Sequence, residues 1–271
     1  MRAALDPAGA LKYLALRSLP FVRQAWARHR DSGLRFRVHL RDVVGRTILR
    51  RRAYEPLLTD WLLARLRQDG GGLFVDVGAN IGWFALQAAR AGQVEQVLAV
   101  EPDVLNHALL RRNIEANGLG ERVLPVACAL GDAPGLARLS VYKDSNLGKH
   151  SLVVDHGHGG SWVPVLPLDG LLASLGLADR PLAALKVDVE GFEPRVFAGA
   201  ARALARCATV LVELSPELSR AGGLDVAVVL DRLQAAGFEP QAWDQAAPLP
   251  GFEGLRRTDR QVTVGFARRQ G

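Results

Sequence analysis

From residue 73 onward, short apolar runs alternate with longer segments in which apolar residues recur at helical spacing. Such runs are typical of buried strands, and the longer segments are typical of amphipathic helices. The strands that this pattern predicts are Leu73–Val77, Gln96–Val100, Arg122–Leu130, Ala184–Val189, Thr209–Leu214, Phe238–Trp243 and Gln261–Ala267, and the helices are Trp83–Ala91, Val104–Ala116, Phe192–Leu204 and Leu224–Ala236. Repeated strand–helix units with almost continuously apolar strands predict an α/β fold, with a mostly parallel sheet and helices on both faces.

The last two predicted strands and residues 131–180 depart from this alternation. No segment of helical length separates Phe238–Trp243 from Gln261–Ala267, so we expect these strands to pair antiparallel at one edge of the sheet. Residues 131–180 are irregular, with short alternating pieces at Ala137–Tyr142 and Trp162–Leu166. We expect this insertion to lie over the carboxyl ends of the strands, where ligands bind in such folds.

Residues 1–70 are expected to form a basic extension ahead of the main domain, which we assign to residues 71–271. They carry fifteen Arg or Lys against six Asp or Glu. The expected elements are a helix over residues 1–30, a strand over Leu34–Leu40, an extended connection over Arg46–Tyr54 and a helix over Leu57–Leu66. A basic arm can bind nucleic acid or an anionic membrane, the latter through residues 1–33. Compositional bias is the alternative, because thirty of the 34 basic residues are Arg.

The sequence favours a cytoplasmic protein. No apolar run approaches the ~18–20 residues that a membrane span requires. Lys12 and Arg17 interrupt the apolar residues of Leu11–Leu19, so we expect no secretory signal.

A loop that contains two glycines, Asp76-Val-Gly-Ala-Asn-Ile-Gly82, follows the first predicted strand. Gly78 permits close approach to the backbone, and Gly82 allows the next helix to pack against the strand. The spacing differs from the G-x-G-x-x-G of dinucleotide-binding proteins, and no Lys-Ser/Thr pair follows that would make a P-loop. The loop suits a ligand with an amino-acid tail, whose ammonium group would lie near Asp76.

Glu101 ends the second predicted strand. An acidic residue at this point of an α/β fold can accept hydrogen bonds from both hydroxyls of a ribose. The alternative is a charge near the start of the helix Val104–Ala116 with no ligand. Together, the loop and Glu101 indicate a ligand that contains a nucleoside.

Five motifs follow one another along the chain: DVGANIGWFAL, AVEPDVLNHALLRRNIEANG, ALGDAPG, VPVLPLDGLL and LKVDVEGFEPRVFAGA. In these motifs the chain resembles the FkbM-like family of S-adenosylmethionine-dependent methyltransferases, over roughly residues 50–215. The resemblance implies a class I, Rossmann-like methyltransferase fold with a seven-stranded sheet whose last strand is antiparallel. It also implies O-methylation of a small molecule, such as a sugar, a glycolipid or a polyketide-type natural product.

By the same resemblance, S-adenosyl-L-methionine is the cofactor. The residues that would bind it are Asp76, Gly78, Ala79, Asn80 and Gly82 at the methionine part, Glu101 at the ribose, and Ala129 and Leu130 near the adenine. The expected partner is a small hydroxylated acceptor. Nucleic acid is disfavoured, because the strand Ala184–Val189 leads into Asp-Val-Glu-Gly and not into the Asn/Asp-Pro-Pro-aromatic sequence of many amine-methylating enzymes.

Ionisable residues recur at every second position of Lys186-Val-Asp-Val-Glu-Gly191, which sends Lys186, Asp188 and Glu190 to one side of the strand. Burying such charges costs several kcal/mol unless they form ion pairs or take part in binding or catalysis. One interpretation is a structural pair of Lys186 and Asp188. The other makes Asp188 and Glu190 catalytic: they would hold the ammonium group of the donor or take the proton of the acceptor hydroxyl. Two adjacent carboxylates could also hold a divalent cation, but no further ligands have a recognisable spacing, so we expect no metal.

His150 is a third candidate catalytic residue, because its segment should overhang the pocket and an imidazole suits a general base. For all three histidines of this stretch, His150, His156 and His158, a polar loop is the simpler interpretation, since a zinc site needs closely arranged ligands. Candidate pocket walls are the aromatic residues Phe36, Tyr54, Trp83, Tyr142 and Trp162. Methylation of nucleic acid or protein through the basic extension stays open as a function, as does a non-catalytic module that binds the donor.

Overall fold

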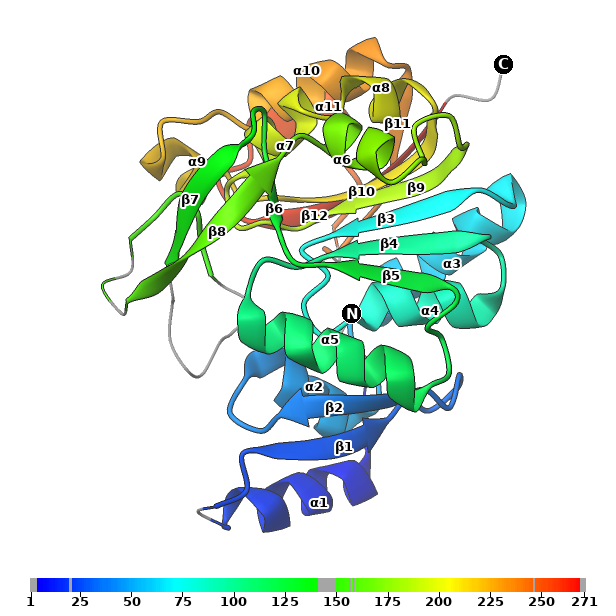
Figure 1. The fold of residues 1–271 in the computed structure, drawn as a ribbon, viewed down its shortest axis with the longest axis vertical. Coiled ribbons are helices and arrows are strands. Elements are labelled where there is room, and N and C mark those ends of the chain that lie inside the picture. The colour runs from blue at the N-terminus through cyan, green and yellow to red at the C-terminus, as the bar shows by residue number, and fades with distance from the viewer. Residues whose placement is uncertain are drawn as a thin grey trace.

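Seven strands form one sheet in the order β11-β12-β10-β9-β3-β4-β5 in the computed structural model, which describes residues 4–19, 21–140, 150–155, 157, 159–245 and 247–268 (Figure 1). The strands are β3 (Leu73–Val77), β4 (Gln96–Val100), β5 (Val123–Val126), β9 (Leu182–Val187), β10 (Cys207–Leu214), β11 (Phe238–Trp243) and β12 (Val262–Arg268). Neighbouring strands are parallel except at β12, which runs antiparallel to both β10 and β11. The predicted fold class is therefore confirmed, including the antiparallel last strand.

Helices cover both faces of this sheet (Figure 1). One face carries α3 (Pro56–Asp69), α4 (Trp83–Ala91) and α5 (Val104–Ala116), and the other carries α6 (Leu168–Ser174), α7 (Glu193–Ala198), α8 (Ala201–Ala205) and α10 (Ala227–Ala235). Two short helices, α9 (Pro216–Ala221) and α11 (Phe252–Arg256), follow β10 and β11. Side chains of β3 alternate between the two cores, with Phe74 in one and Leu73 and Val75 in the other. Burial on both faces explains why this strand is almost wholly apolar.

A second, three-stranded sheet follows β5, in the order β6-β8-β7. It contains β6 (Ala129–Leu130), β7 (Gly135–Ser140) and β8 (Gly160–Leu166). The single strand predicted over Arg122–Leu130 is therefore wrong. Its first part pairs with β4, which ends at Val100 opposite Val126, so the chain has no neighbour left in the main sheet and joins β8 instead.

The helix predicted over Phe192–Leu204 is also wrong, because the chain forms two helices with a break at Gly199. A side chain on Gly199 would strike the backbone of Gly131, and the Gly199 carbonyl accepts the N–H of Asp169 at 3.0 Å. The Asp169 carboxylate accepts two backbone N–H groups at the start of α8, each at 2.8 Å. These contacts are made by segments distant in the sequence, so helical periodicity could not reveal them.

The N-terminal seventy residues form α1 (Pro7–Arg17), β1 (Gln24–Arg28), β2 (Arg35–His39) and α2 (Val43–Arg51) before α3 begins. The helix predicted over residues 1–30 is wrong after Arg17, because β1 pairs antiparallel with β2 and buries Ala25 and Ala27. The strand predicted over Leu34–Leu40 and the helix predicted over Leu57–Leu66 are present.

The extended connection predicted over Arg46–Tyr54 is wrong, because α2 occupies most of it. Asp42 caps this helix by accepting the N–H of Gly45 at 3.0 Å. Its buried residues are Val44, Gly45, Ile48 and Leu49. The arginines between these residues hid the apolar spacing.

The N-terminal elements share a core with α3, α4 and α5. The rings of Phe36 and Trp83 have centroids 5.0 Å apart. Asn113 of α5 accepts the N–H of Arg37 at 2.6 Å, so β2 is fixed against that helix, and the two lie side by side in Figure 1. Within the described residues, no helix is both long enough and apolar enough to cross a membrane.

Candidate active site

Polar residues at the carboxyl ends of β3, β4 and β9 meet in one cleft. We call it the central cleft, and its lining residues are Val77, Gly78, Asn80, Val100, Glu101, Pro102, Asn106, Cys128, Ala129, Leu130, Leu139, His150, Leu152, Asp188, Val189 and Glu190. Of the candidate site residues from the sequence, Asp76, Ala79 and Gly82 do not line it. The fold thus gathers most of these candidates from segments that are far apart along the chain.

Three residues of the loop between β3 and α4 have positive φ angles: 74° at Gly78, 51° at Asn80 and 89° at Gly82. A side chain on Gly78 would strike the carbonyl oxygen of Asp188, and one on Gly82 would strike Leu110 of α5. The two glycines therefore let the loop pack against the segment after β9 and against α5. The sequence indicated a close approach to the backbone at Gly78. In the structure, the group that approaches is the carbonyl of Asp188.

Glu101 joins the loops that follow β3 and β4. One carboxylate oxygen accepts the N–H of Asn80 at 2.7 Å, and the other accepts the N–H of Asp103 at 2.9 Å. Burial raises the pKa of Glu101 to about 7. Each carboxylate oxygen has a second lone pair, so Glu101 can accept further hydrogen bonds at the cleft.

Lys186 lies between two carboxylates and is almost fully buried. Its Nζ is 3.2 Å from Asp76 Oδ1 and 3.4 Å from Asp188 Oδ2, and it donates to the carbonyl of Gly78 at 2.9 Å. Burial lowers the pKa of Lys186, but the Asp76 and Asp188 carboxylates outweigh burial and raise the pKa, so the ammonium group stays charged. The structural pair considered from the sequence therefore exists, with Asp76 as an additional partner.

Asp76 is fully buried, and it also accepts the N–H of Ala85 in the first turn of α4 at 3.0 Å. Asp188 differs, because 38% of its side chain is exposed at the cleft. The same lysine thus holds one carboxylate inside the core and another where a ligand can reach it.

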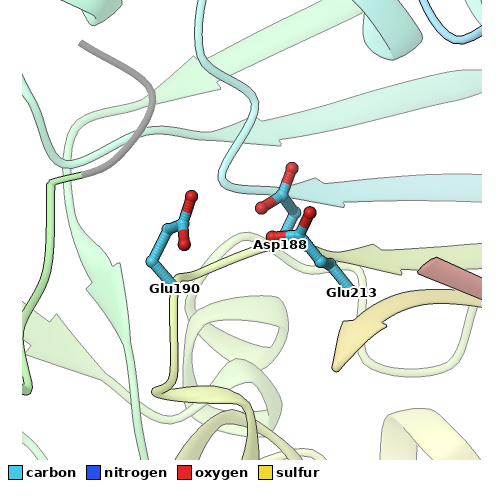
Figure 2. A group of neighbouring side chains, drawn as sticks. All are labelled: Asp188, Glu190 and Glu213. Atoms are coloured by element: carbon cyan, nitrogen blue, oxygen red, sulfur yellow. The ribbon is translucent and has the colours of Figure 1, made fainter. Parts of the chain in front are cut away.

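Figure 2 shows three carboxylates together, from Asp188 and Glu190 after β9 and from Glu213 on β10. One oxygen atom from each of the three carboxylates lies within 4.8 Å of the other two, a spacing that a divalent cation could use. Gln261 Nε2 donates to Glu190 at 3.0 Å and to Glu213 at 2.6 Å. Burial, with the Asp188 and Glu190 carboxylates nearby, raises the pKa of Glu213 well above its usual range. The ionised neighbours therefore disfavour the charged form of Glu213.

His150 lines the central cleft from the segment before β8. Its side chain is buried, and its Nε2 lies 3.7 Å from Asp103 Oδ2. The adjacent Ser151 donates to the carbonyl of Glu190 at 3.2 Å, which ties this segment to the loop after β9. The segment lies at the cleft as expected, and a catalytic role for His150 stays a prediction.

Glu213 and Gln261 are not among the residues that the sequence suggested, because each belongs to a predicted strand without a motif. The available signal was that Glu213 is an acidic residue in the apolar run Thr209–Leu214. Of the aromatic candidates, Phe36 and Trp83 are buried in the core, Trp162 is exposed, and Tyr54 lines a different cavity. Tyr142, His156 and His158 lie outside the described residues.

Comparisons with known proteins point to one family. The methyltransferase FkbM domain matches residues 76–240. The curated protein 31-O-demethyl-FK506 methyltransferase FkbM of Streptomyces tacrolimicus is 31% identical over 176 residues, which are 54% of this chain and 66% of that protein. Methyltransferase sdnD of Sordaria araneosa is 30% identical over 101 residues, which are 37% of this chain and 38% of that protein. The chain therefore spans just under two thirds of the first relative and less than half of the second.

Among solved structures, methyltransferase FkbM from Methylobacillus flagellatus KT has a TM-score of 0.46 and 19% identity, over 73% of this chain and 44% of that chain. The family match rests on sequence and covers more than half of the chain. It includes the loop Asp76–Gly82 and the residues Glu101, Asp188 and Glu190. The chain therefore belongs to the methyltransferase FkbM domain family.

Proposed function

We propose that this chain transfers a methyl group from S-adenosylmethionine to a hydroxyl oxygen of a small molecule, such as a sugar, a glycolipid or a polyketide-type natural product. Membership of the family supports methyl transfer. The name of the relative 31-O-demethyl-FK506 methyltransferase supports an oxygen of a natural product as the acceptor.

The lining of the central cleft suits this donor in its chemistry. Glu101 offers a carboxylate to ribose hydroxyls, and Val100, Cys128 and Leu130 offer an apolar wall to a base. The free volume of the cleft is about 60 Å³, whereas ligand sites usually begin near ~300 Å³. We therefore expect the lining residues to move apart when the donor binds.

The bound donor would supply an electrophilic methyl group on a sulfonium, so no protein nucleophile is needed. The remaining tasks are to align the acceptor hydroxyl and to remove its proton. Asp188 suits both tasks, because its carboxylate is partly exposed at the cleft and is held by Lys186 at 3.4 Å. It accepts a hydrogen bond from the hydroxyl and then takes the proton. Glu190, on the same segment, holds the ammonium group of the donor.

The observation that carries the proposal is that Glu101 and Asp188, from the ends of β4 and β9, line one cleft. The test is a transfer assay with a labelled methyl group against hydroxylated sugars and polyketides. Asp188→Asn should lower turnover roughly 10²–10⁴-fold, the usual contribution of a general base. The matched control is Asp179→Asn, an exposed residue outside the cleft, which should keep the wild-type rate.

Calorimetry separates the ways in which this proposal could fail. Absence of a heat of binding for S-adenosylmethionine and for its demethylated product, with the fold intact, would contradict the whole proposal. Binding of the donor without transfer to any acceptor would favour a non-catalytic module. Wild-type turnover in Asp188→Asn would contradict only the role given to that carboxylate.

A further inference from the structure

A second cavity, of about 660 Å³, lies beside α2, the segment between α2 and α3, and the residues that follow β11. We call it the arginine cavity, and its lining residues are Val43, Arg46, Thr47, Arg50, Arg51, Ala53, Tyr54, Glu55, Pro56, Leu57, Leu58, Asp244 and Gln245. Its volume lies within the range of ~300–1,000 Å³ that is typical of small-molecule sites. The family's match begins only at residue 76, so it does not include α2.

One face of α2 forms the basic wall of this cavity. Val43, Arg46 and Arg50 recur three and four residues apart and therefore share a face of the helix. Ile48 and Leu49 are buried against the core on the other side. Packing of the apolar face thus directs the arginines toward the cavity.

The guanidinium groups of Arg46 and Arg50 have no acidic partner within the ranges that the structure describes. Asp6 donates its backbone N–H to the Arg50 carbonyl, yet its carboxylate lies 3.8 Å from Arg30 and 3.9 Å from Arg52 instead. The Arg50 guanidinium lies 5.6 Å from the centroid of the Tyr13 ring, a contact that leaves its N–H groups available. Cationic groups that line a cavity without a carboxylate partner are suited to an anionic ligand.

The opposite end of the cavity is acidic and reaches the carboxyl edge of the main sheet. Asp244 follows β11, donates its N–H to the Thr263 carbonyl at 3.1 Å, and accepts the Thr263 N–H at 3.3 Å. Thr263 is the register partner of Glu213 on β10. At Asp244 the cavity is therefore separated by one strand, β12, from Glu213, and β9 with Asp188 and Glu190 lies on the far side of β10 (Figure 2).

Tyr54 and Glu55 line the arginine cavity on the side of α4, the helix that follows the loop of the central cleft. The Tyr54 ring contacts that of Trp83, at the start of α4, with centroids 6.1 Å apart. Burial and the charge of Asp188 raise the pKa of Glu55 to about 7. A ligand in the cavity would thus have cations at one end and carboxyl groups at the other.

We propose that the arginine cavity binds the methyl acceptor, and that this acceptor is a small hydroxylated molecule with a phosphate group held by Arg46 and Arg50. The proposal rests on the proposed function, because it names the acceptor of the same reaction. Guanidinium groups bind phosphate through paired N–H donors, and the acidic end repels phosphate. The charge distribution therefore orients the acceptor, with its phosphate at α2 and its hydroxyl toward Asp188.

The first test is titration of inorganic phosphate into the full chain at low salt, followed by calorimetry. The double variant Arg46→Gln/Arg50→Gln should bind phosphate at least about tenfold more weakly than wild type, since charge-assisted hydrogen bonds are lost. The matched control is Arg41→Gln/Arg67→Gln, which removes the same charge from two exposed arginines outside the cavity and should leave binding unchanged. If the double variant does not fold, Arg46→Gln alone makes the same comparison. Absent or unchanged phosphate binding would overturn the proposal.

The second test compares transfer to pairs of sugars that differ only in a phosphate group. The double variant should raise KM at least about tenfold for the phosphorylated sugar, with little change in kcat or in the rate with the unphosphorylated one. Wild-type enzyme that prefers the unphosphorylated sugar would overturn the proposal. A different result is that the double variant loses phosphate binding while no form of the chain binds the donor. This result would confirm the phosphate site at Arg46 and Arg50 but refute the proposed function.

Vesicles distinguish the phosphate group of a small molecule from that of a lipid headgroup. Phosphatidylcholine vesicles with and without phosphatidylglycerol should bind the chain to the same extent in wild type and in the double variant. Phosphatidylglycerol-dependent binding that requires Arg46 and Arg50, without binding of inorganic phosphate, would overturn the proposal in favour of a membrane surface.

Discussion

The central cleft and the arginine cavity differ in whether their charged groups have partners within the protein. In the cleft, Glu101 accepts two backbone N–H groups, and next to the cleft Lys186 lies between the carboxylates of Asp76 and Asp188. In the cavity, Arg46 lacks an acidic partner among the residues that the structure describes. The cleft is also narrow, about 60 Å³ against about 660 Å³. Charges that are engaged by the protein hold its loops together, whereas charges that line open space are available to a ligand.

The comparison predicts that the largest loss of stability follows from removing the cation of the cleft. Lys186→Met would leave Asp76 buried without a counter-charge, which costs roughly 3–5 kcal/mol of the free energy of unfolding. Urea titration measures this loss. The control Lys12→Met removes a lysine that donates at the surface to the Trp26 carbonyl, and it should change stability by less than about 1 kcal/mol. Equal losses in the two variants would contradict the structural role of Lys186.

A somewhat smaller loss of the free energy of unfolding is expected at Gly78, where two loops of the cleft meet. Gly78→Ala introduces a Cβ against the carbonyl oxygen of Asp188 at a positive φ, so it should cost roughly 2–4 kcal/mol and weaken donor binding. Gly118→Ala is the matched control, because Gly118 has a φ of 65° but no neighbour within 4 Å. Gly118→Ala should lower the free energy of unfolding by about 1 kcal/mol, because only the unfavourable backbone conformation contributes. Chemical denaturation of both variants measures the difference, and a difference near zero would mean that the loops can separate freely.

Glu101 predicts a pH-dependent change in the free energy of unfolding of roughly 3 kcal/mol. Its native pKa of about 7 lies above the ordinary value of 4.5, so the native state holds the proton more tightly than the unfolded chain does. The contribution of this group to stability is therefore present below pH 4.5 and is lost as pH rises to about 7.

Glu101→Gln should remove this loss, so its stability relative to wild type should improve as pH rises through the same window. Unfolding curves across that window measure the change. The exposed Glu121→Gln is the control and should show no such trend. A Glu101→Gln difference that is flat with pH would show that the native pKa of Glu101 is not raised above its ordinary value.

The smallest effect is expected in the arginine cavity. Arg46→Gln removes a cation with no ion-pair partner among the described residues, so the free energy of unfolding should change by no more than about 0.5 kcal/mol. Thermal and urea unfolding of this variant measure the change. A loss above about 1 kcal/mol would show that Arg46 supports the fold, and the contrast between the two regions would then be weaker.

Most of the central cleft could be predicted, because its residues stand in short loops directly after strands. The apolar runs locate β3, β4 and β9, and the polar residues after them must lie at one edge of a parallel sheet. Asp76 is the instructive exception. The sequence suggested that it lies near the ammonium group of a ligand, whereas in the structure Lys186 is its neighbour in the register of β3 and β9.

The arginine cavity could not be predicted in the same way. Its basic wall is a helix whose arginines obscured the apolar spacing of Val44 and Ile48, and its acidic end at Asp244 comes from the other end of the chain. Glu213 and Gln261 were missed for a related reason, since each is a single polar residue whose partner lies on another strand.

The sequence by itself determined the parallel sheet, the bend at Gly78–Gly82 and the acid at Glu101, because strand periodicity and turn chemistry act over a few neighbouring residues. The tertiary structure alone decided which charges are neutralised and which remain available. Coulombic and hydrogen-bond partners are set by distance in space, and strand register and helix packing bring Asp76 to Lys186 while leaving Arg46 in a cavity.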